Sequence, residues 1–112
     1  MPKRASIPLP GMAGMMRRQL EDLQSRMLEA QQELQNLTVV GSAGGGAVKV
    51  TMTGQQRVVV VEIDRAAMEG GDREMLEDMV TAAVNDAITK AQELATQKMN
   101  AVTGGVNLPG LF

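Results

Sequence analysis

The stretch from Thr38 to Asp64, TVVGSAGGGAVKVTMTGQQRVVVVEID, decides the fold of this chain. It contains three runs typical of β-strands, at residues 38–43, 48–53 and 57–63. A glycine triplet separates the first two runs, and Gly-Gln-Gln separates the last two. In the second run Val and Met alternate with Lys and Thr, a pattern that indicates a half-exposed strand. The stretch therefore predicts a three-stranded antiparallel meander.

The third run differs because four consecutive valines place apolar side chains on both of its faces. Such a strand is expected to be covered on both faces, or to be central in a larger sheet. We therefore expect the sheet to be the hub of a dimer. The expected interface residues are Val48, Val50, Val58, Val59, Val60 and Val61.

The glycine-rich run 41–49 invites comparison with a phosphate-binding loop, and the comparison fails. Lys49 is followed by Val50 where a phosphate loop has Ser or Thr, and a strand follows where a helix is needed. Because glycine is the ordinary residue of tight turns, the run predicts a turn.

Residues 12–37 have the pattern of a long helix with a narrow apolar stripe. The stripe repeats every three or four residues, as in a coiled coil, through Met16, Leu20, Leu23, Met27, Ala30, Leu34 and Leu37. Such a stripe packs against another helix. The sequence leaves open whether that helix belongs to the same chain or to a second copy.

A second long helix is predicted at residues 72–103. Asp72 is the expected N-cap, and acidic residues follow it where the helix dipole favours them. Before it, Asp64 is expected to cap a short helical turn at 65–69. The long helix has a wide apolar face in which alanines permit close approach: Leu76, Val80, Ala83, Val84, Ala87, Ile88, Ala91, Leu94, Ala95 and Val102.

These elements predict an α+β fold in one domain, residues 12–105. It follows a flexible basic arm, 1–11, and precedes a tail, 106–112. The second helix, about 46 Å long, must cross the sheet and leave it beside the first helix, antiparallel to it. We therefore expect a projecting two-helix arm, with the acidic start of the second helix at the opposite end of the sheet. The arm would carry Arg17, Arg18, Lys90 and Lys98.

Composition excludes most enzyme classes. The chain of 112 residues has no cysteine and no histidine, so it has neither a thiolate nor the commonest general base and metal ligand. The carboxylates Glu74, Glu77, Asp78, Glu62 and Asp64 stand where helix caps and a strand end favour acids. We expect no catalytic site, metal, cofactor or small-molecule substrate. No signal peptide or membrane-spanning run is evident, which predicts a soluble intracellular protein.

Charge distribution favours a nucleic-acid partner although the net charge is −2. Residues 1–20 carry Lys3, Arg4, Arg17 and Arg18 and no acid, and basic arms of this kind contact phosphates. The expected strands carry no aromatic side chain on which single-stranded bases could stack. We therefore expect contact with the backbone of duplex DNA. The alternative is a protein–protein adaptor that uses the Met-rich helical arm or the Leu-Pro-Gly-Leu-Phe tail.

Several motifs together resemble the YbaB/EbfC family of bacterial nucleoid-associated proteins. They include the runs around Val40-Gly41, Gly46–Thr51 and Val58–Asp64, and the run EMLEDMV at 74–80 followed by Ala82-Ala83 and Asn85-Asp86-Ala87. Lys98-Met99 and the tail from Gly105 to Phe112 also match. The resemblance runs from about Met16 onward.

This resemblance implies a homodimer in which the sheets join and the paired helices project as tweezers. It implies DNA binding with low or modest sequence preference in the cytoplasm, at the nucleoid, where it contributes to chromosome organisation and gene regulation. It implies no enzymatic activity and no cofactor. Basic residues recur on the projecting helices of the family, and Arg18, Arg26, Lys90 and Lys98 stand at or next to such positions.

Overall fold

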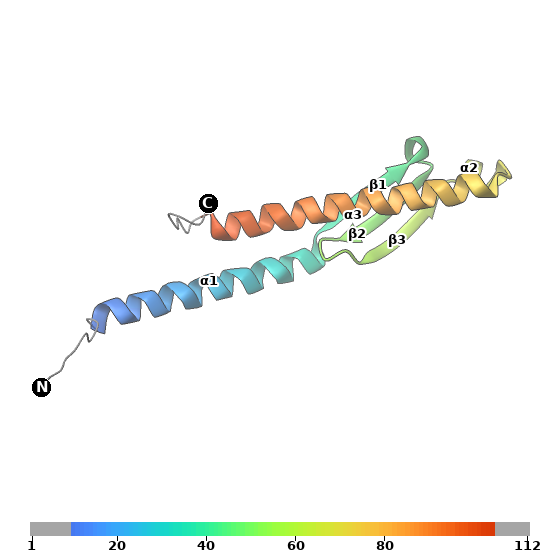
Figure 1. Ribbon diagram of the computed structural model, residues 1–112. Coiled ribbons are helices and arrows are strands. Elements are labelled where there is room, and N and C mark those ends of the chain that lie inside the picture. The colour runs from blue at the N-terminus through green and yellow to red at the C-terminus, as the bar shows by residue number, and fades with distance from the viewer. Residues whose placement is uncertain (1–9, 105–112) are drawn as a thin grey trace, which may run out of the picture.

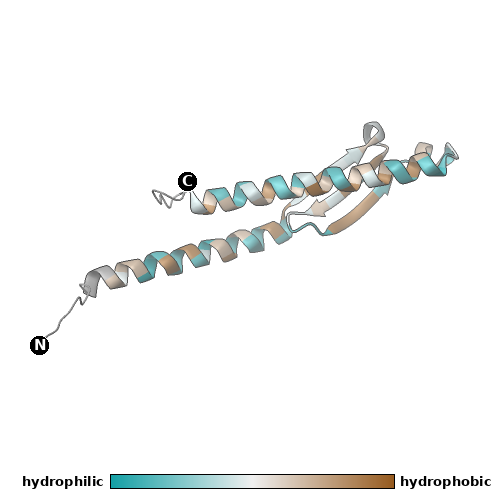
Figure 2. Ribbon diagram, viewed as in Figure 1, coloured by the Kyte–Doolittle hydropathy of each residue, from teal (hydrophilic) through white to brown (hydrophobic). Residues whose placement is uncertain are grey.

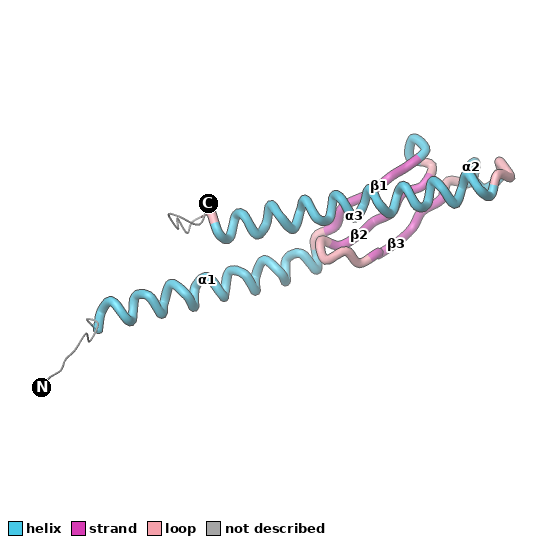
Figure 3. Tube along the Cα trace, in the orientation of Figure 1, coloured by secondary structure: helices cyan, strands magenta, loops and turns pink. Residues whose placement is uncertain are grey.

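The computed structural model describes residues 10–104, and the side chains of residues 13–104. Its elements follow the predicted order of long helix, three strands, short helix and long helix (Figures 1 and 3). They are α1 (Pro10–Asn36), β1 (Thr38–Ala43), η1 (Gly44–Gly46), β2 (Val48–Thr53), β3 (Val58–Ile63), α2 (Arg65–Glu69) and α3 (Arg73–Thr103). The molecule is elongated, 86 × 25 × 21 Å. None of the helices in the described range has an apolar stretch long enough to cross a bilayer.

The sheet is the predicted antiparallel meander, with strand order β1-β2-β3. Thr38 of β1 pairs with Thr53 of β2, and Val48 of β2 pairs with Ile63 of β3. The glycine triplet forms the turn between β1 and β2, with positive φ angles from 64° to 97°. L-residues with side chains rarely adopt these angles, which explains the glycines there without any ligand.

The core lies between one face of the sheet and α3. Its fully buried members are Val48, Val50 and Met52 of β2 and Ala83, Ala87 and Ala91 of α3. A Cβ added at Gly41 of β1 would overlap the backbone of Ala83 and Ala87. Glycine on the strand and alanine on the helix therefore let the two backbones come close together, as the alanine spacing predicted.

We expect Gly41→Ala to lower the free energy of unfolding by about 2–3 kcal/mol, because the added methyl group meets helix backbone that cannot move aside. Gly14→Ala is the matched control. A Cβ at Gly14 in α1 meets nothing within 4 Å, so this change is expected to raise helix stability by about 0.5–1 kcal/mol. Urea denaturation at one fixed protein concentration measures both changes. Equal effects at the two sites would contradict the close approach of α3 to β1.

The position of β3 differs from the expectation of a strand covered on both faces. In the single chain β3 is an edge strand, and every residue from Val58 to Ile63 is exposed. The reason is that α3 packs on β1 and β2, where Gly41 admits it, and leaves β3 uncovered. In Figure 2, β3 is accordingly an apolar strand along one side of the sheet. Val48 and Val50, expected at a dimer interface, are instead buried beneath the chain's own helix.

The helix α1 runs beside the C-terminal half of α3, as the element lengths predicted (Figure 1). Its apolar stripe is only partly covered. Ala30 and Leu34 are 4% and 5% exposed, whereas Met16 and Leu20 are 63% and 62% exposed. The expected two-helix arm is thus a single helix over its N-terminal part, because α3 ends beside the middle of α1 (Figure 1).

Candidate nucleic-acid interface

Arg17 and Arg18 precede Arg26, the residue of α1 that lines a groove with Ala101 and Val102 near the end of α3. They therefore lie on the part of α1 that extends beyond the end of α3, which Figure 1 shows as a single helix. Both side chains are exposed, and neither forms an ion pair with any residue in the range 13–104. An exposed arginine with no carboxylate partner keeps all of its donors available for a phosphate. These two residues therefore lie, as predicted, on the projecting part of a helix, and their contact with DNA stays a prediction.

Two other predicted contacts, Arg26 and Lys98, form ion pairs within the chain. Arg26 Nη2 lies 3.0 Å from Asp22 Oδ2, one turn away on α1. Lys98 Nζ lies 2.7 Å from Glu33 Oε2 and so joins α3 to α1. In both cases the neighbouring carboxylate offsets part of the positive charge that a phosphate would meet. The predicted contacts Lys3 and Arg4 lie outside the described residues.

Lys90 does not lie on the projecting arm where the sequence placed it. Its Nζ donates a hydrogen bond to the carbonyl oxygen of Val40 at 3.0 Å and lies 3.2 Å from Asp86 Oδ2. Asp86 Oδ2 in turn accepts a hydrogen bond from the backbone amide of Ser42 at 3.0 Å. Lys90 is therefore on the body of the protein, over β1, and not on an arm. Sequence reasoning missed these contacts, although the i,i+4 spacing of Asp86 and Lys90 was visible.

The ion pair of Asp86 and Lys90 closes the outer edge of β1. It occupies the carbonyl of Val40 and the amide of Ser42. Both groups point away from β2, on the side where another strand could otherwise pair with β1. The hydrogen bond from the Ser42 amide, together with Lys90, holds the pKa of the Asp86 carboxyl below its ordinary value. The ionised form of Asp86 is therefore the one that the folded state favours.

We expect the contribution of Asp86 to stability to disappear in acid. Because its pKa in the folded chain lies below the ordinary value of 3.8, the contribution is complete above that value and is lost as the pH falls through the lowered pKa. Asp86→Asn should therefore be less stable than the parent at pH 7, and the difference should shrink below about pH 4. Urea denaturation of both proteins from pH 7 to pH 2 measures it. A difference that does not change with pH would contradict the assignment.

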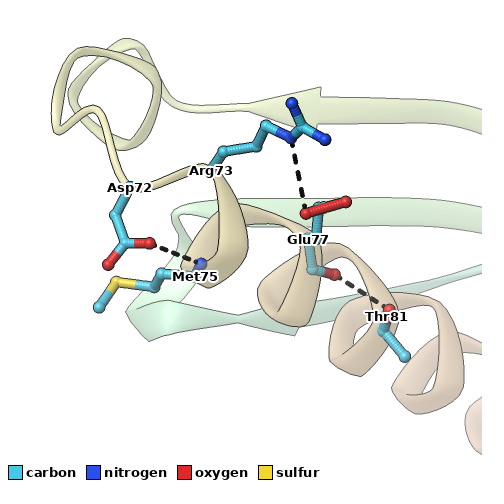
Figure 4. A network of polar contacts seen from close by, with 5 residues as sticks. All are labelled: Asp72, Arg73, Met75, Glu77 and Thr81. Atoms are coloured by element: carbon cyan, nitrogen blue, oxygen red, sulfur yellow. Dashed lines mark hydrogen bonds and ion pairs between the residues drawn. The ribbon is translucent and has the colours of Figure 1, made fainter.

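Two of the acidic residues at the start of α3, Asp72 and Glu77, have structural partners (Figure 4). The carboxylate of Asp72 accepts the backbone amide of Met75 at 3.0 Å, which confirms the predicted N-cap. Glu77 lies 3.8 Å from Arg73, and its carbonyl oxygen accepts the hydroxyl of Thr81. Asp64 precedes α2 as predicted, but its side chain makes no capping hydrogen bond. Within the described residues, no three carboxylates gather as a metal site.

The two ends of the molecule therefore differ in charge. Arg17 and Arg18, which have no ion-pair partner among residues 13–104, lie in the N-terminal part of α1. The acidic start of α3 lies beyond the far end of the sheet (Figure 1). A family model described as the YbaB/EbfC DNA-binding family matches residues 9–106, almost the whole chain. The chain belongs to the YbaB/EbfC DNA-binding family. This is a DNA-binding family and not a family of enzymes.

Relatives within the YbaB/EbfC family carry a consistent description. The chain is 47% identical over 97 residues to a nucleoid-associated protein of Pelotomaculum thermopropionicum, covering 87% of this chain and 92% of that protein. It is 47% identical over 93 residues to a nucleoid-associated protein of Syntrophobacter fumaroxidans, covering 83% of this chain and 84% of that protein. A nucleoid-associated protein of Desulfotalea psychrophila is 42% identical over 93 residues, covering 83% of this chain and 88% of that protein.

A crystal structure of an uncharacterized protein from Helicobacter pylori has the same fold. It superposes with a TM-score of 0.58 at 22% sequence identity, covering 70% of this chain and 90% of that one. The likeness supports the element order and topology of the YbaB/EbfC chain described above.

Proposed function

We propose that the protein is a dimeric nucleoid-associated protein that grips the backbone of duplex DNA with the tips of its α1 helices. The observation that carries this proposal is the exposure of Arg17 and Arg18, without ion-pair partners among residues 13–104, on the projecting part of α1. The described relatives are named nucleoid-associated proteins, which supports a location at the nucleoid in the cytoplasm.

The expected mode of binding follows from the chemistry of this tip. Arginine contacts to phosphate oxygens hold a protein on the duplex but carry no base information. The described part of the arm before Arg26 is a single helix whose charged residues are Arg17, Arg18, Glu21 and Asp22. So few cations favour modest affinity from one arm, and two arms would double the contacts. We therefore infer low sequence specificity and a role in chromosome organisation and gene regulation.

The dimer is proposed to form through β3, because the two edges of the sheet differ. The β1 edge is occupied by Asp86 and Lys90, as described above. The β3 edge has no covering element in the described chain, and its valines are 41–59% exposed. An open, apolar edge strand is a template for pairing with another strand. Two copies joined here would form one continuous sheet, with a helical arm extending from each copy.

The elongated shape also favours a second copy. The radius of gyration is 23.1 Å, whereas a compact chain of this length has one of about 13 Å. Pairing at β3 would bury valines that the single chain leaves in water, and this burial is favourable by about 25 cal/mol per Å2 of apolar surface.

A salt titration of duplex binding tests the proposed function. Each phosphate contact releases counterions, so the logarithm of the association constant should fall linearly with the logarithm of salt concentration. Arg17 and Arg18 of two copies would contribute about −3 to −4 to that slope. Fluorescence anisotropy with a labelled duplex, at salt concentrations from 50 to 300 mM, gives the slope directly. Affinity that does not change with salt would overturn the proposal.

A further inference from the structure

The apolar stripe of α1 continues past the point where α3 ends. Ala30 and Leu34 are buried against the rest of the chain, whereas Met27, Leu20 and Met16 on the same stripe are 37%, 62% and 63% exposed. Residues three and four apart on a helix share one face, so these exposed side chains extend the contact made by the buried pair. In the described chain this helix face is thus buried over one half and exposed over the other.

The end of α3 lies at the boundary between the two halves. A shallow groove there is lined by Arg26, Glu29 and Ala30 of α1 and by Lys98, Ala101 and Val102 of α3. Because α3 runs antiparallel to α1, the chain that leaves α3 at Gly104 leaves it beside α1, at the start of the open half of the stripe (Figure 1).

The sequence that follows α3 has a suitable composition and length. Residues 105–112 read GVNLPGLF, with four large apolar side chains and no charged one. Eight residues extended reach about 26 Å. The open stripe from Met27 to Met16 spans about 16 Å of helix. The segment is therefore long enough to cover the whole open stripe even if the chain turns at Pro109-Gly110.

We propose that residues 106–112 dock on the open stripe of their own chain's α1, in the place that α3 would occupy if it were longer. The segment's apolar side chains pack on Met27, Leu23, Leu20 and Met16, and so cover the part of the arm that α3 does not reach. Arg18 is two residues from Leu20 and hence on the opposite side of the helix. The docked segment therefore leaves Arg18 exposed, whereas Arg17 is three residues from Leu20 and borders the stripe. The inference does not rest on the proposed DNA binding, because it is argued from the apolar stripe alone.

Disulfide trapping tests this docking in the full chain, which has no cysteine of its own. Leu20→Cys with Leu108→Cys should close within one chain under oxidised glutathione at least tenfold faster than Asp22→Cys with Leu108→Cys. Asp22 is nearer to the end of α3 but on the opposite side of α1, so this control separates docking from mere proximity. Equal rates for the two pairs would overturn the proposal.

Two further measurements identify the occupant of the stripe. If chains carrying only Leu20→Cys cross-link efficiently to chains carrying only Leu108→Cys, the stripe binds the segment of a second copy, and the same-chain assignment is wrong. In Leu111→Asp/Phe112→Asp, the amides of residues 16–27 should exchange with solvent several-fold faster than in the parent, and those of β2 at an unchanged rate. Unchanged exchange at 16–27 in this variant would show that another surface covers the stripe.

Discussion

Replacing Arg17 and Arg18 with glutamate is expected to abolish measurable binding to duplex DNA at 0.1 M salt. The change removes two cations from each arm and puts two anions in their place, so attraction to the phosphates becomes repulsion. A dimer would lose up to four phosphate contacts, which corresponds to a loss of at least about a hundredfold in affinity. The double alanine variant should bind detectably, with a salt slope shallower by about 3 to 4. Anisotropy titrations measure both variants.

Arg73→Glu is the matched control for these variants. Arg73 is also an exposed helical arginine, with 90% of its side chain accessible, but it lies at the acidic far end of the molecule. Reversing the charge of Arg73 should leave DNA binding nearly unchanged. If binding depended only on the net charge of the protein, the Arg73→Glu variant would also bind DNA more weakly. Because Arg17 and Arg18 have no ion-pair partner in the range 13–104, circular dichroism and urea denaturation should show little change in stability. Unaltered DNA binding by the double glutamate variant would refute the arm assignment.

A proline at Val61 is expected to convert the protein into a monomer. The hydrogen bond from the Asp64 amide to the Ala47 carbonyl fixes the alternation of β3, so that the amide of Val61 points away from β2. Proline there removes a donor only from the open edge and leaves the bonds to β2 intact. Light scattering should then give a mass near the 11.9 kDa of one chain, where the parent gives about twice that value.

Val40→Pro is the same substitution at the opposite edge of the sheet. The carbonyl of Val40 points outward to Lys90, and so does its amide, because both groups of a strand residue face the same side. This variant should remain a dimer, because that edge is already closed by the side chains of Asp86 and Lys90. A dimeric Val61→Pro protein, or a monomeric Val40→Pro protein, would contradict pairing through β3.

Local signals in the sequence were sufficient to predict the elements and most of their ends. Glycines with positive φ mark the first turn, and the alternation of Val and Met with Lys and Thr marks β2. Asp72 marks the start of α3. Each of these signals depends on the conformation of a few neighbouring residues, so it can be recognised before the tertiary structure is known.

Predictions about contacts were less successful because they depend on where the elements meet. The run of valines in β3 indicated cover on both faces or a central place in a larger sheet. The single chain leaves β3 uncovered, and hydrophobicity alone does not say which strands a helix will cover. Backbone approach at Gly41, Ala83 and Ala87 decides that, and it places α3 on β1 and β2. The same placement buries Val48 and Val50 within the chain, where the sequence alone had suggested an interface.

For the basic residues too, the sequence predicted local features, and the tertiary structure was needed to identify their long-range partners. The sequence by itself determined that Arg17 and Arg18 lie on a helix in a stretch without acids, because helix periodicity and charge pattern are local. Only the tertiary structure decided that Lys90 bonds to β1 and that Lys98 pairs with Glu33, because these partners are 50 and 65 residues away in the chain. A lysine on a long stem binds whichever oxygen the packing brings within reach.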